Sequence, residues 1–492
     1  MESKINKGPI LGMRHVQTFL IFFNVTAIYC SRLNIGVAVV AMTNADTTNP
    51  DFPEYDWTEK EISYILSSFF WGYVCTQFLG GILCKKFGAK INMGVSTFVS
   101  ALLTVLTPWC VGWGGWQVFC AIRVIQGLVQ GVIFPCIYEH LALWSPAEER
   151  NRLGGFSMTG VDCGTILAMA ISGIIAKGSM GWPGISYVSA GICFAWCLLW
   201  LILGSNSPNE SKFITESEKQ YLELSVAHKN DSQDQKIPVP WKAVLTSLPF
   251  YALIVARSAQ NWGLSTMQSQ IPSYLNGVLD MEIQANGLFS SLPFMGMLVM
   301  SFVYLMLEDV LRRKKILTLK GVRRVFNTVS FWIPACGLIG IGFLDGDNKP
   351  LAISLMTLSV AINSGNIIGS ALNTIDLAPN HAGSLMSVVN TVSNFTPFIS
   401  PLVVGVIVTD VHERSLWQIV FAIAAAIFFF GNLFYITCGT TDTQPWDAED
   451  FLIPKVSQSA ERGYNKSIDD LGVYNKGMDL ETNISDLNKT EK

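Results

Sequence analysis

Three arginines sit inside long stretches of the chain that carry no other charge. Arg32 lies in "VTAIYCSRLNIGVAVVAM" (25–42), Arg123 in "AIRVIQGLVQGVIFP" (121–135) and Arg257 in "ARSAQNWGLSTMQSQ" (256–270). An arginine at the centre of a membrane helix costs about 2.5–3.5 kcal/mol on insertion scales, so each should face a cavity or a partner. Because the guanidinium fork matches carboxylate and phosphate oxygens, arginines aimed at one cavity predict an anion-binding site.

Amide side chains follow these arginines at the spacing of one helical face. Gln130 lies seven residues after Arg123, and Gln260 lies three residues after Arg257. A third polar stripe, at steps of three or four residues, includes Asn366. We expect these three amides to line an aqueous cavity together with the arginines and to bind the substrate. The alternative is that they only join helices by hydrogen bonds, which are common between membrane helices.

Acidic residues supply candidates for ion coupling. Asp162 lies in "GGFSMTGVDCGTILAMAISG" (154–173), and Glu139 lies near the end of the fourth apolar stretch. A titratable acid inside a membrane segment is a functional candidate, since proton relays and ion pathways use such groups. Both carboxylates are therefore predicted coupling residues, although the position of Glu139 favours a solvated helix end.

Charged residues at the ends of apolar stretches predict gates. Glu149, Arg150 and Arg152 lie in "EERNR" (148–152), and Asp376 lies in "NTIDLAP" (373–379). Their places beside, rather than inside, the apolar stretches favour a conformational gate over a substrate site.

The elements that must position these residues are membrane helices. Half of the 492 residues are hydrophobic, only 14% are charged, and the mean hydropathy is +0.38, whereas soluble proteins carry about a quarter charged residues. The charges gather in bursts, leaving apolar stretches of the roughly 20 residues that a crossing needs. We predict an all-α membrane protein with twelve transmembrane helices in two six-helix halves. The predicted spans are 16–42, 62–84, 91–111, 116–144, 153–177, 184–204, 244–275, 285–307, 325–345, 350–375, 382–408 and 416–438.

These spans divide the chain into four parts. We predict a first half at 1–204, a linker at 205–243, a second half at 244–438 and a disordered tail at 439–492. Lysine and arginine cluster in alternate loops, as in "CKKFGAK" (84–90) and "RRKKILTLKGVRR" (312–324). Since cytoplasmic loops are rich in these residues, both termini, the linker and the tail are predicted to be cytoplasmic.

Other classes of protein are disfavoured. No nucleophile–base pair, metal-ligand cluster or phosphate-binding glycine loop stands out, so we expect neither enzyme activity nor a cofactor. The net charge is −4 and no basic arm is present, so no nucleic-acid partner is expected. The expected partners are a small anion, sodium or a proton, and the lipid bilayer, and the chain is expected to be a monomer.

Several stretches carry a family resemblance: "YCSRLNIGVAVVAM" (29–42), "RVIQGLVQG" (123–131) followed by "FP", "WSPAEERNRL" (144–153), "NTIDLAP" and "QPW" (444–446). Together they resemble the anion/cation symporter family of the major facilitator superfamily. That family includes sialin, the vesicular glutamate transporters and the type I sodium–phosphate cotransporters. The resemblance spans 15–447 and is strongest to insect proteins named for inorganic phosphate cotransport.

This resemblance implies anion transport coupled to sodium or protons, by alternating access between the two halves. Arg32 and Arg123 match family arginines that are linked with the substrate anion or with gating. Two titratable groups of the proton-coupled members are replaced, one by Gln130 and the other by Tyr138 after Pro135. These replacements favour sodium over protons.

Two further departures concern arginine and aspartate positions. The seventh-span arginine of the glutamate carriers falls on Gln260, with Arg257 one turn earlier, which makes glutamate specificity doubtful. The superfamily's usual aspartate in the first basic loop is Lys85, whereas the second copy keeps Asp309.

Three functions remain open at this stage. The leading one is a sodium-coupled transporter of inorganic phosphate or a small organic anion, in the plasma membrane rather than a lysosome or vesicle. The second is a proton-coupled lysosomal or vesicular carrier of acidic sugars or amino acids. The third is a transporter-like sensor that binds without translocating, which Lys85 would favour.

Overall fold

The computed structural model describes residues 11–44, 49–146, 149–223, 239–344, 348–448 and 451. Most of the tail predicted to be disordered, and the centre of the linker, lie outside these residues. Within the described ranges the secondary structure is helical, without a strand. Long apolar stretches form helices because a helix satisfies every backbone polar group within its own segment.

The first half contains six membrane crossings. The first crossing is broken at Asn34. The second, third and most of the fourth crossing form one continuous helical segment, because the chain turns at Gly88 and Gly115 with hardly a break in the helical hydrogen bonds. These glycines have φ of 80° and 61°, a left-handed conformation that favours glycine. The helices are α1 (Met13–Leu33), α2 (Ile35–Thr43), α3 (Glu59–Gln130), α4 (Ile133–Trp144), α5 (Arg150–Met158), α6 (Gly160–Lys177) and α7 (Gly181–Leu203), followed by the short η2 (Pro208–Glu210).

The second half repeats this arrangement. The tenth span, the fourth of this half, is interrupted by a 3-10 segment. The fourth span of the first half is also interrupted, between the end of α3 at Gln130 and the start of α4 at Ile133. The helices are α9 (Trp241–Val244), α10 (Leu248–Gly277), α11 (Ile283–Arg313), α12 (Leu319–Gly342), α13 (Lys349–Asn363), η4 (Ser364–Ile367), α14 (Ser370–Leu377), α15 (Ala382–Ser393), α16 (Phe395–Ile407), α17 (Arg414–Cys438) and η5 (Pro445–Asp447).

Nine helical stretches of the described chain are long and apolar enough to cross a membrane. One of them, 86–144, contains two predicted spans, because α3 and α4 follow each other with hardly a gap. Two predicted spans are not among the nine, the start of α3 and the polar α10. The predicted seventh span, 244–275, begins too early, since α10 starts at Leu248 after a separate short helix.

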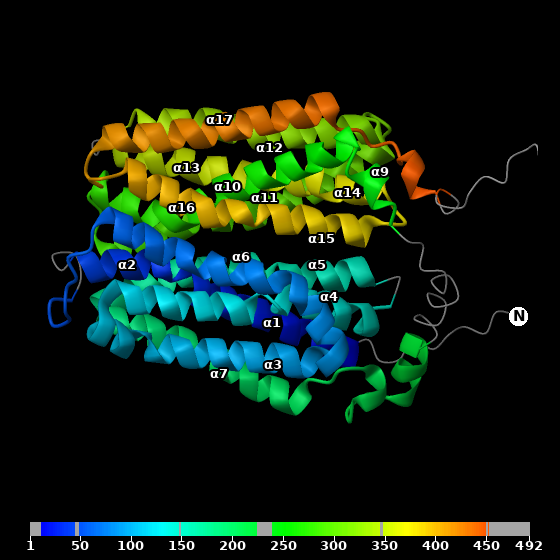
Figure 1. Ribbon diagram of the computed structural model, residues 1–492, viewed down its shortest axis with the longest axis horizontal. Helices are drawn as coiled ribbons and strands as arrows, with labels where there is room; N and C mark the ends of the chain where they lie inside the picture. Colours follow the sequence, from blue (N-terminus) through cyan, green and yellow to red (C-terminus); the bar gives the residue numbers. More distant parts are fainter. Residues whose placement is uncertain are drawn as a thin grey trace, which may run out of the picture.

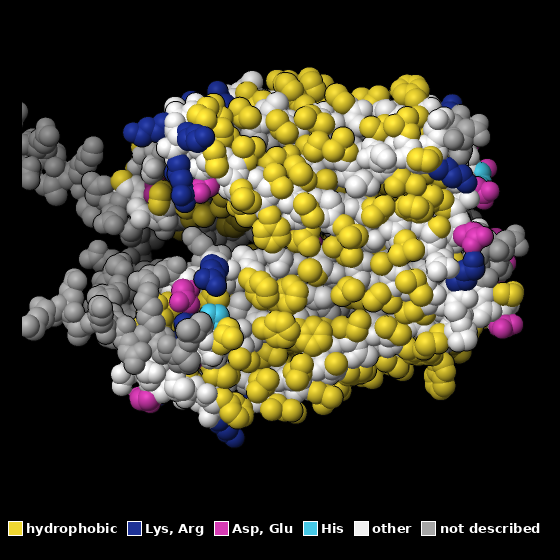
Figure 2. All heavy atoms as spheres, turned by 180° about the vertical axis from the view of Figure 1, so that it is seen from behind, with side chains coloured by type: hydrophobic (Ala, Val, Ile, Leu, Met, Phe, Trp, Pro, Cys, Tyr) yellow, Lys and Arg dark blue, Asp and Glu magenta, His cyan; other side chains and the backbone are white. Residues whose placement is uncertain are grey.

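The helices form two bundles, with α1–α7 in one and α9–α17 in the other (Figure 1). The first and last described segments, near Met13 and Asp447, lie at the same end of the molecule, here called the termini end. The two bundles touch chiefly through α6 and α11, α3 and α16, and α2 and α10. At the termini end the surface is hollowed between the bundles (Figure 2), so the molecule is open at that end.

Closure at the opposite end depends on two glycines. A Cβ atom on Gly173 of α6 would lie 2.6 Å from the carbonyl oxygen of Ile283, and one on Gly287 of α11 would lie 2.7 Å from that of Met169. Only glycine allows backbones to approach this closely, as at other crossings of membrane helices. The crossing of α6 and α11 therefore closes the molecule at the end away from the termini.

Candidate functional site

Arg32 projects from the end of α1 into a group of aromatic rings. Its guanidinium carbon lies 4.4 Å from the ring centre of Phe69, 4.8 Å from those of Phe70 and Tyr73, and 5.3 Å from that of Tyr29. The side chain is buried, and its Nε has no hydrogen-bond partner. Cation–π contacts of this kind contribute about 0.5–2 kcal/mol each. They hold the guanidinium in place and leave its Nε without a partner among the described residues.

Arg123 lies directly behind Arg32. Its Nη2 donates to the carbonyl oxygen of Arg32 at 3.2 Å, its Nη1 donates to Gln126 at 3.4 Å, and its guanidinium carbon lies 5.0 Å from the ring centre of Phe69. A cavity of about 20 Å³, lined by this arginine, Asn34 and several hydroxyl side chains, adjoins it. In the described part of the chain, neither arginine forms an ion pair with a carboxylate.

Arg257 brings a third guanidinium from the other bundle. It lies on α10, within electrostatic range of Tyr138 and Tyr29 across the gap between the halves. Tyr138 is 57% exposed, and Tyr29 also belongs to the aromatic group around Arg32. Arg32 from the first half and Arg257 from the second half are therefore both near Tyr29. We call Tyr29, Arg32, Tyr73, Arg123, Tyr138 and Arg257 the arginine site.

Gln130 does not face this space, in contrast to the expectation from its spacing. Its Nε2 donates to the hydroxyl of Ser100 at 2.7 Å, and Gln126 likewise donates to Thr104 at 3.0 Å. Both hydrogen bonds join the fourth span to the third within one bundle. On this face of the fourth span, the side chains that follow Arg123 therefore point toward the third span and not toward the gap between the halves.

The amides of the second half also form contacts within their own bundle. Gln260 donates to the Oδ1 of Asn363 at 2.5 Å, and Asn366 donates to the carbonyl oxygen of Asn363 at 2.9 Å. Both side chains are almost fully buried, and the Oε1 of Gln260 and the Oδ1 of Asn366 have no partner. These amides stabilise the broken tenth span against α10. The spacing of polar residues along a helix predicts such contacts between helices as readily as it predicts ligand binding.

Asp162 lies on the side of α6 that meets the other half. Seven and eleven residues later on the same face are Met169 and Gly173, which contact α11 where the halves touch. The side chain of Asp162 is half-buried and has no hydrogen bond or ion pair among the described residues. Glu139 is exposed beside Tyr138 and is likewise without an ion pair in that part of the chain. Asp162 thus shares a helix face with residues at the contact between the halves, whereas Glu139 is exposed on α4.

Glu149 takes part in a buried cluster rather than in a contact with its own neighbours. Arg14 at the start of α1 donates to Glu149 at 2.9 Å and to Glu218 of the linker at 3.0 Å. Arg152 is exposed, and the side chain of Arg150 lies outside the described part of the chain. Arg14 and Glu218 were not among the predicted gating residues, because the linker sequence gives no sign of which bundle it contacts.

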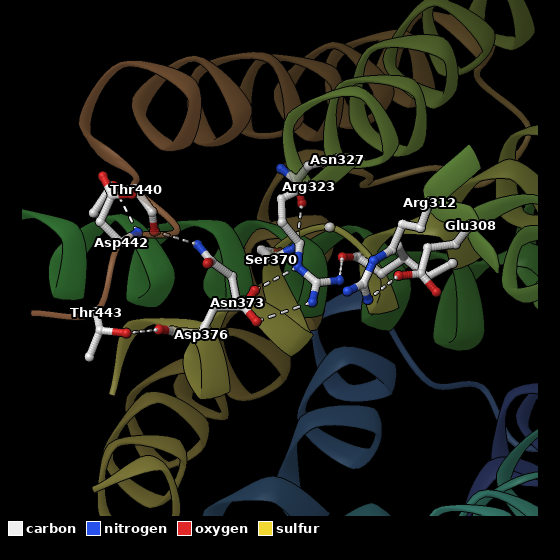
Figure 3. Close-up of polar contacts among 12 residues, drawn as sticks. Glu308, Arg312, Arg323, Asn327, Ser370, Asn373, Asp376, Thr440, Asp442 and Thr443 are labelled. Carbon is white, nitrogen blue, oxygen red and sulfur yellow. Dashed lines mark hydrogen bonds and ion pairs between the residues drawn. The ribbon is translucent and has the colours of Figure 1, made fainter. Parts of the chain in front are cut away.

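Asp376 forms a two-point contact at the termini end of the second half. Arg323 donates to it at 2.7 and 3.4 Å, and the third guanidinium nitrogen donates to the carbonyl oxygen of Ile368 at 2.7 Å, inside the break of the tenth span. Figure 3 shows this guanidinium pointing at the carboxylate, with Asn373 and the segment from Thr440 to Thr443 beside them. The arginine therefore joins the two pieces of the broken helix.

Residues 21–401 match the family model described as Major Facilitator Superfamily. The chain belongs to this superfamily. Like other members of the major facilitator superfamily, it is a multi-pass membrane transporter and not an enzyme.

Three relatives illustrate its place in the major facilitator superfamily. A Drosophila melanogaster protein named "Putative inorganic phosphate cotransporter" is 33% identical over 458 residues, 88% of this chain and 86% of that protein. Human sialin is 32% identical over 458 residues, 89% of this chain and 91% of sialin. Vesicular glutamate transporter 1 of Xenopus tropicalis is 32% identical over 423 residues, 84% and 73% of the two chains. This confirms the resemblance read from the motifs.

The fold also agrees with solved structures of the superfamily. The xylose transporter XylE from E. coli, in a partially occluded inward open conformation, superimposes with a TM-score of 0.66 at 13% identity, covering 86% of this chain and 96% of XylE. At that identity the likeness concerns the fold alone. It agrees with the all-helical architecture predicted from the spans and with the major facilitator fold that the resemblance implied.

The end of this major facilitator fold opposite the termini carries polar contacts that the sequence did not predict. Lys177 at the end of α6 forms an ion pair with Glu282 at the start of α11, and Asn44 donates to Asn276 at 3.2 Å. The partners of each pair belong to different halves. Within the described residues, no group of three His, Cys, Asp or Glu side chains is arranged to hold a metal ion.

Proposed function

We propose that this protein is a secondary active transporter that moves inorganic phosphate or a small organic anion by alternating access, coupled to sodium. The observation that carries this proposal is the arginine site, where Arg32 and Arg257 come from opposite halves to the neighbourhood of Tyr29 and neither forms an ion pair with a described carboxylate. A guanidinium withdrawn from water needs a counter-charge, because a buried unpaired charge is costly. A mobile anion that enters from the open end would supply it.

The tyrosine hydroxyls of the site support an oxyanion as the substrate. Tyr29 and Tyr138 lie near Arg257, and Tyr73 lies beside Arg32. Hydroxyl donors and guanidinium forks together can bind several oxygens of a tetrahedral or planar anion. The relative named for inorganic phosphate cotransport makes phosphate the first anion to test.

Sodium is proposed as the coupling ion because titratable groups are scarce near the arginine site. The carboxylates proposed for coupling are Asp162 and Glu139, and the amide of Gln130 is bound to Ser100. Oxygen ligands suit a hard cation, and Asp162 is the proposed charged contribution to coupling. Glu149, Arg152 and Asp376 are proposed to act in the gate at the termini end.

A second candidate is a proton-coupled vesicular or lysosomal carrier of acidic sugars or amino acids. The similarity to sialin and to a vesicular glutamate transporter favours it. In that case Asp162 or Glu139 would carry the proton. We propose cytoplasmic termini for either case, since the basic loops lie at the termini end, and the plasma membrane for the first.

Reconstituted protein would decide between these functions. Uptake of labelled phosphate and of a panel of organic anions would be followed in proteoliposomes, under an inward sodium gradient at fixed pH or a proton gradient without sodium. Sodium-driven phosphate uptake would support the leading proposal. Proton-driven uptake of a carboxylate would support the second candidate, and anion binding without uptake under either gradient would indicate a sensor.

A further inference from the structure

Four cations at the termini end of the second half have no acidic partner within the described residues. Lys314, Lys315 and Lys320 are exposed and Arg324 is half-exposed, and none of them forms an ion pair with a described residue. The nearby acids are already engaged. Within α11 the ion pairs are Glu308–Arg312 at 3.3 Å and Asp309–Arg313 at 2.8 Å, and Asp376 is bound by Arg323 at 2.7 Å. We call the four unpaired cations the basic patch.

A tight turn holds the basic patch together. Helix α11 ends at Arg313, and Lys315 adopts a φ of 54°, a left-handed conformation, while its amide donates to the carbonyl oxygen of Arg312 at 3.0 Å. Helix α12 begins only a few residues later, with Thr318 accepting from the amide of Gly321 at 3.1 Å. The positive end of the α12 dipole therefore adds to the charge of the patch.

Apolar side chains lie exposed beside these cations. Ile316, in the turn itself, is 60% exposed, and on α11 Met306 and Val310 are 71% and 44% exposed. Met306 and Val310 are four residues apart and share the outer face of a membrane helix. Figure 2 shows Lys and Arg side chains at this end of the second half, next to the apolar band that covers the bundle. The basic patch thus lies at the boundary between apolar surface and water.

We propose that the basic patch binds the headgroup of an anionic phospholipid in the adjacent leaflet. Four or more cations directly beyond a membrane helix attract anionic lipids. The exposed Ile316 would insert among the acyl chains while the lysines reach the phosphate, as amphipathic side chains do at interfaces. A general bias of positive loops would explain the sign of the charge. It would not explain an apolar side chain held outward in the middle of the turn.

Native mass spectrometry of the purified full-length protein in detergent tests this proposal. Phosphatidylserine and phosphatidylcholine would be offered at equal amounts, and the copies of each retained per protein would be counted. We expect about a tenfold preference for phosphatidylserine, lost in the variant K314Q/K315Q/K320Q/R324Q. If that variant unfolds, the double variant K314Q/K315Q is used, because it changes only the exposed turn. It removes two of the four charges and should lower the logarithm of the phosphatidylserine preference by about half. This measurement needs no transport, so it stands apart from the proposed function.

Matched variants separate the patch from net charge. K86Q/K212Q/K219Q/K242Q removes four cations from other exposed or half-exposed positions and should leave the preference unchanged. K314R/K315R/K320R/R324K keeps the charge and should retain it. Survival of the preference in the fourfold patch variant, or equal loss in the matched control, would overturn the proposal.

Discussion

A guanidinium surrounded by aromatic rings is the central residue-scale feature of this transporter. Arg32 contacts four rings, and its position in an otherwise apolar stretch would be unfavourable without them. Aromatic faces satisfy the charge without competing for its N–H groups, because cation–π contacts use the ring face and not a hydrogen bond. The rings therefore stabilise the charge, and the Nε, which has no partner among the described residues, is a donor that could bind an anion.

Replacing Arg32 by alanine should reduce anion uptake by about tenfold or more, because a charge-assisted hydrogen bond contributes about 1.5–3 kcal/mol. Arg32→Lys should restore part of the uptake, since it keeps the charge and loses the fork. Uptake into proteoliposomes at equal protein density is the measurement. Arg313→Ala, an exposed arginine paired only with Asp309, is the control and should be neutral. Normal uptake by Arg32→Ala would rule out its proposed role.

Asp162→Asn should weaken the dependence of uptake on the driving cation, because it removes the half-buried carboxylate that faces the other half. We expect the sodium concentration for half-maximal uptake to rise about tenfold, equivalent to about 1.4 kcal/mol. Glu139→Gln is the comparison, since that carboxylate is exposed and should matter less. Unchanged sodium and pH profiles in Asp162→Asn would leave the residue with a packing role only.

At the scale of elements, each half is fastened by a carboxylate that lies beyond its last membrane helix. Glu218 accepts from the amides of Met13 and Arg14 at 2.9 and 3.0 Å, at the start of α1. Asp447 accepts from the amides of Asn380 and His381, both at 3.2 Å, next to the start of α15. A carboxylate at these positions satisfies amides that a helix leaves unpaired and complements its dipole. Segments outside the spans therefore help to set the positions of membrane helices.

Glu218→Gln should lower the thermal stability of the protein in detergent. The variant leaves Arg14 buried with one carboxylate instead of two, and breaking a buried ion pair costs about 3–5 kcal/mol. Because Glu149 remains as a partner, we expect about half of that loss. Glu216→Gln, at an exposed site two residues earlier, should have no effect. A midpoint equal to that of the unchanged protein would show that the linker does not fasten α1.

At the scale of the whole molecule, the two bundles are in contact at one end and apart at the other. The contacts at the closed end are of two kinds, a close crossing of backbones at Gly173 and Gly287 and polar pairs such as Lys177–Glu282. Alternating access requires that these contacts break when the termini end closes. Their strength therefore sets the balance between the two states.

Gly173→Val should shift this balance toward closure of the termini end. Its side chain would collide with the backbone at Ile283, which only separation of α6 and α11 relieves. Electron paramagnetic resonance distances between spin labels on the two halves at the termini end should shorten. Gly191→Val is the matched control, because nothing lies within 4 Å of a Cβ atom there. Unaltered distances in Gly173→Val would mean that the crossing does not open during transport.

The Lys177–Glu282 pair should make the closed end weakly sensitive to acid. The hydrogen bond and charge of Lys177 lower the pKa of Glu282 below its ordinary value. A lowered carboxylate pKa stabilises the paired state above the ordinary value and loses that contribution as pH falls through the lowered one. The same distances should therefore be steady from pH 7 to about 5 and change only below about pH 4. Glu282→Gln should abolish this acid response, and its persistence would assign it elsewhere.

Much of this protein follows from sequence alone. Apolar length, the basic loops and the motifs around Arg32 and Arg123 are local properties, so the spans and the family could be predicted from them. The proposal of an anion site also comes from the sequence, because an arginine in a membrane helix carries its cost wherever the helix is placed.

Tertiary structure decided what these residues contact. Helical spacing places Gln130 on the face of Arg123, yet only packing against the third span turned it toward Ser100. The partners of Arg14, Lys177 and Asp376 come from segments distant in sequence, and no local pattern specifies such pairs. The sequence determines which helix carries a charge into the membrane, because the cost of burying that charge arises in each helix separately. The partner of the charge depends on how the helices pack, which is a property of the assembled bundles.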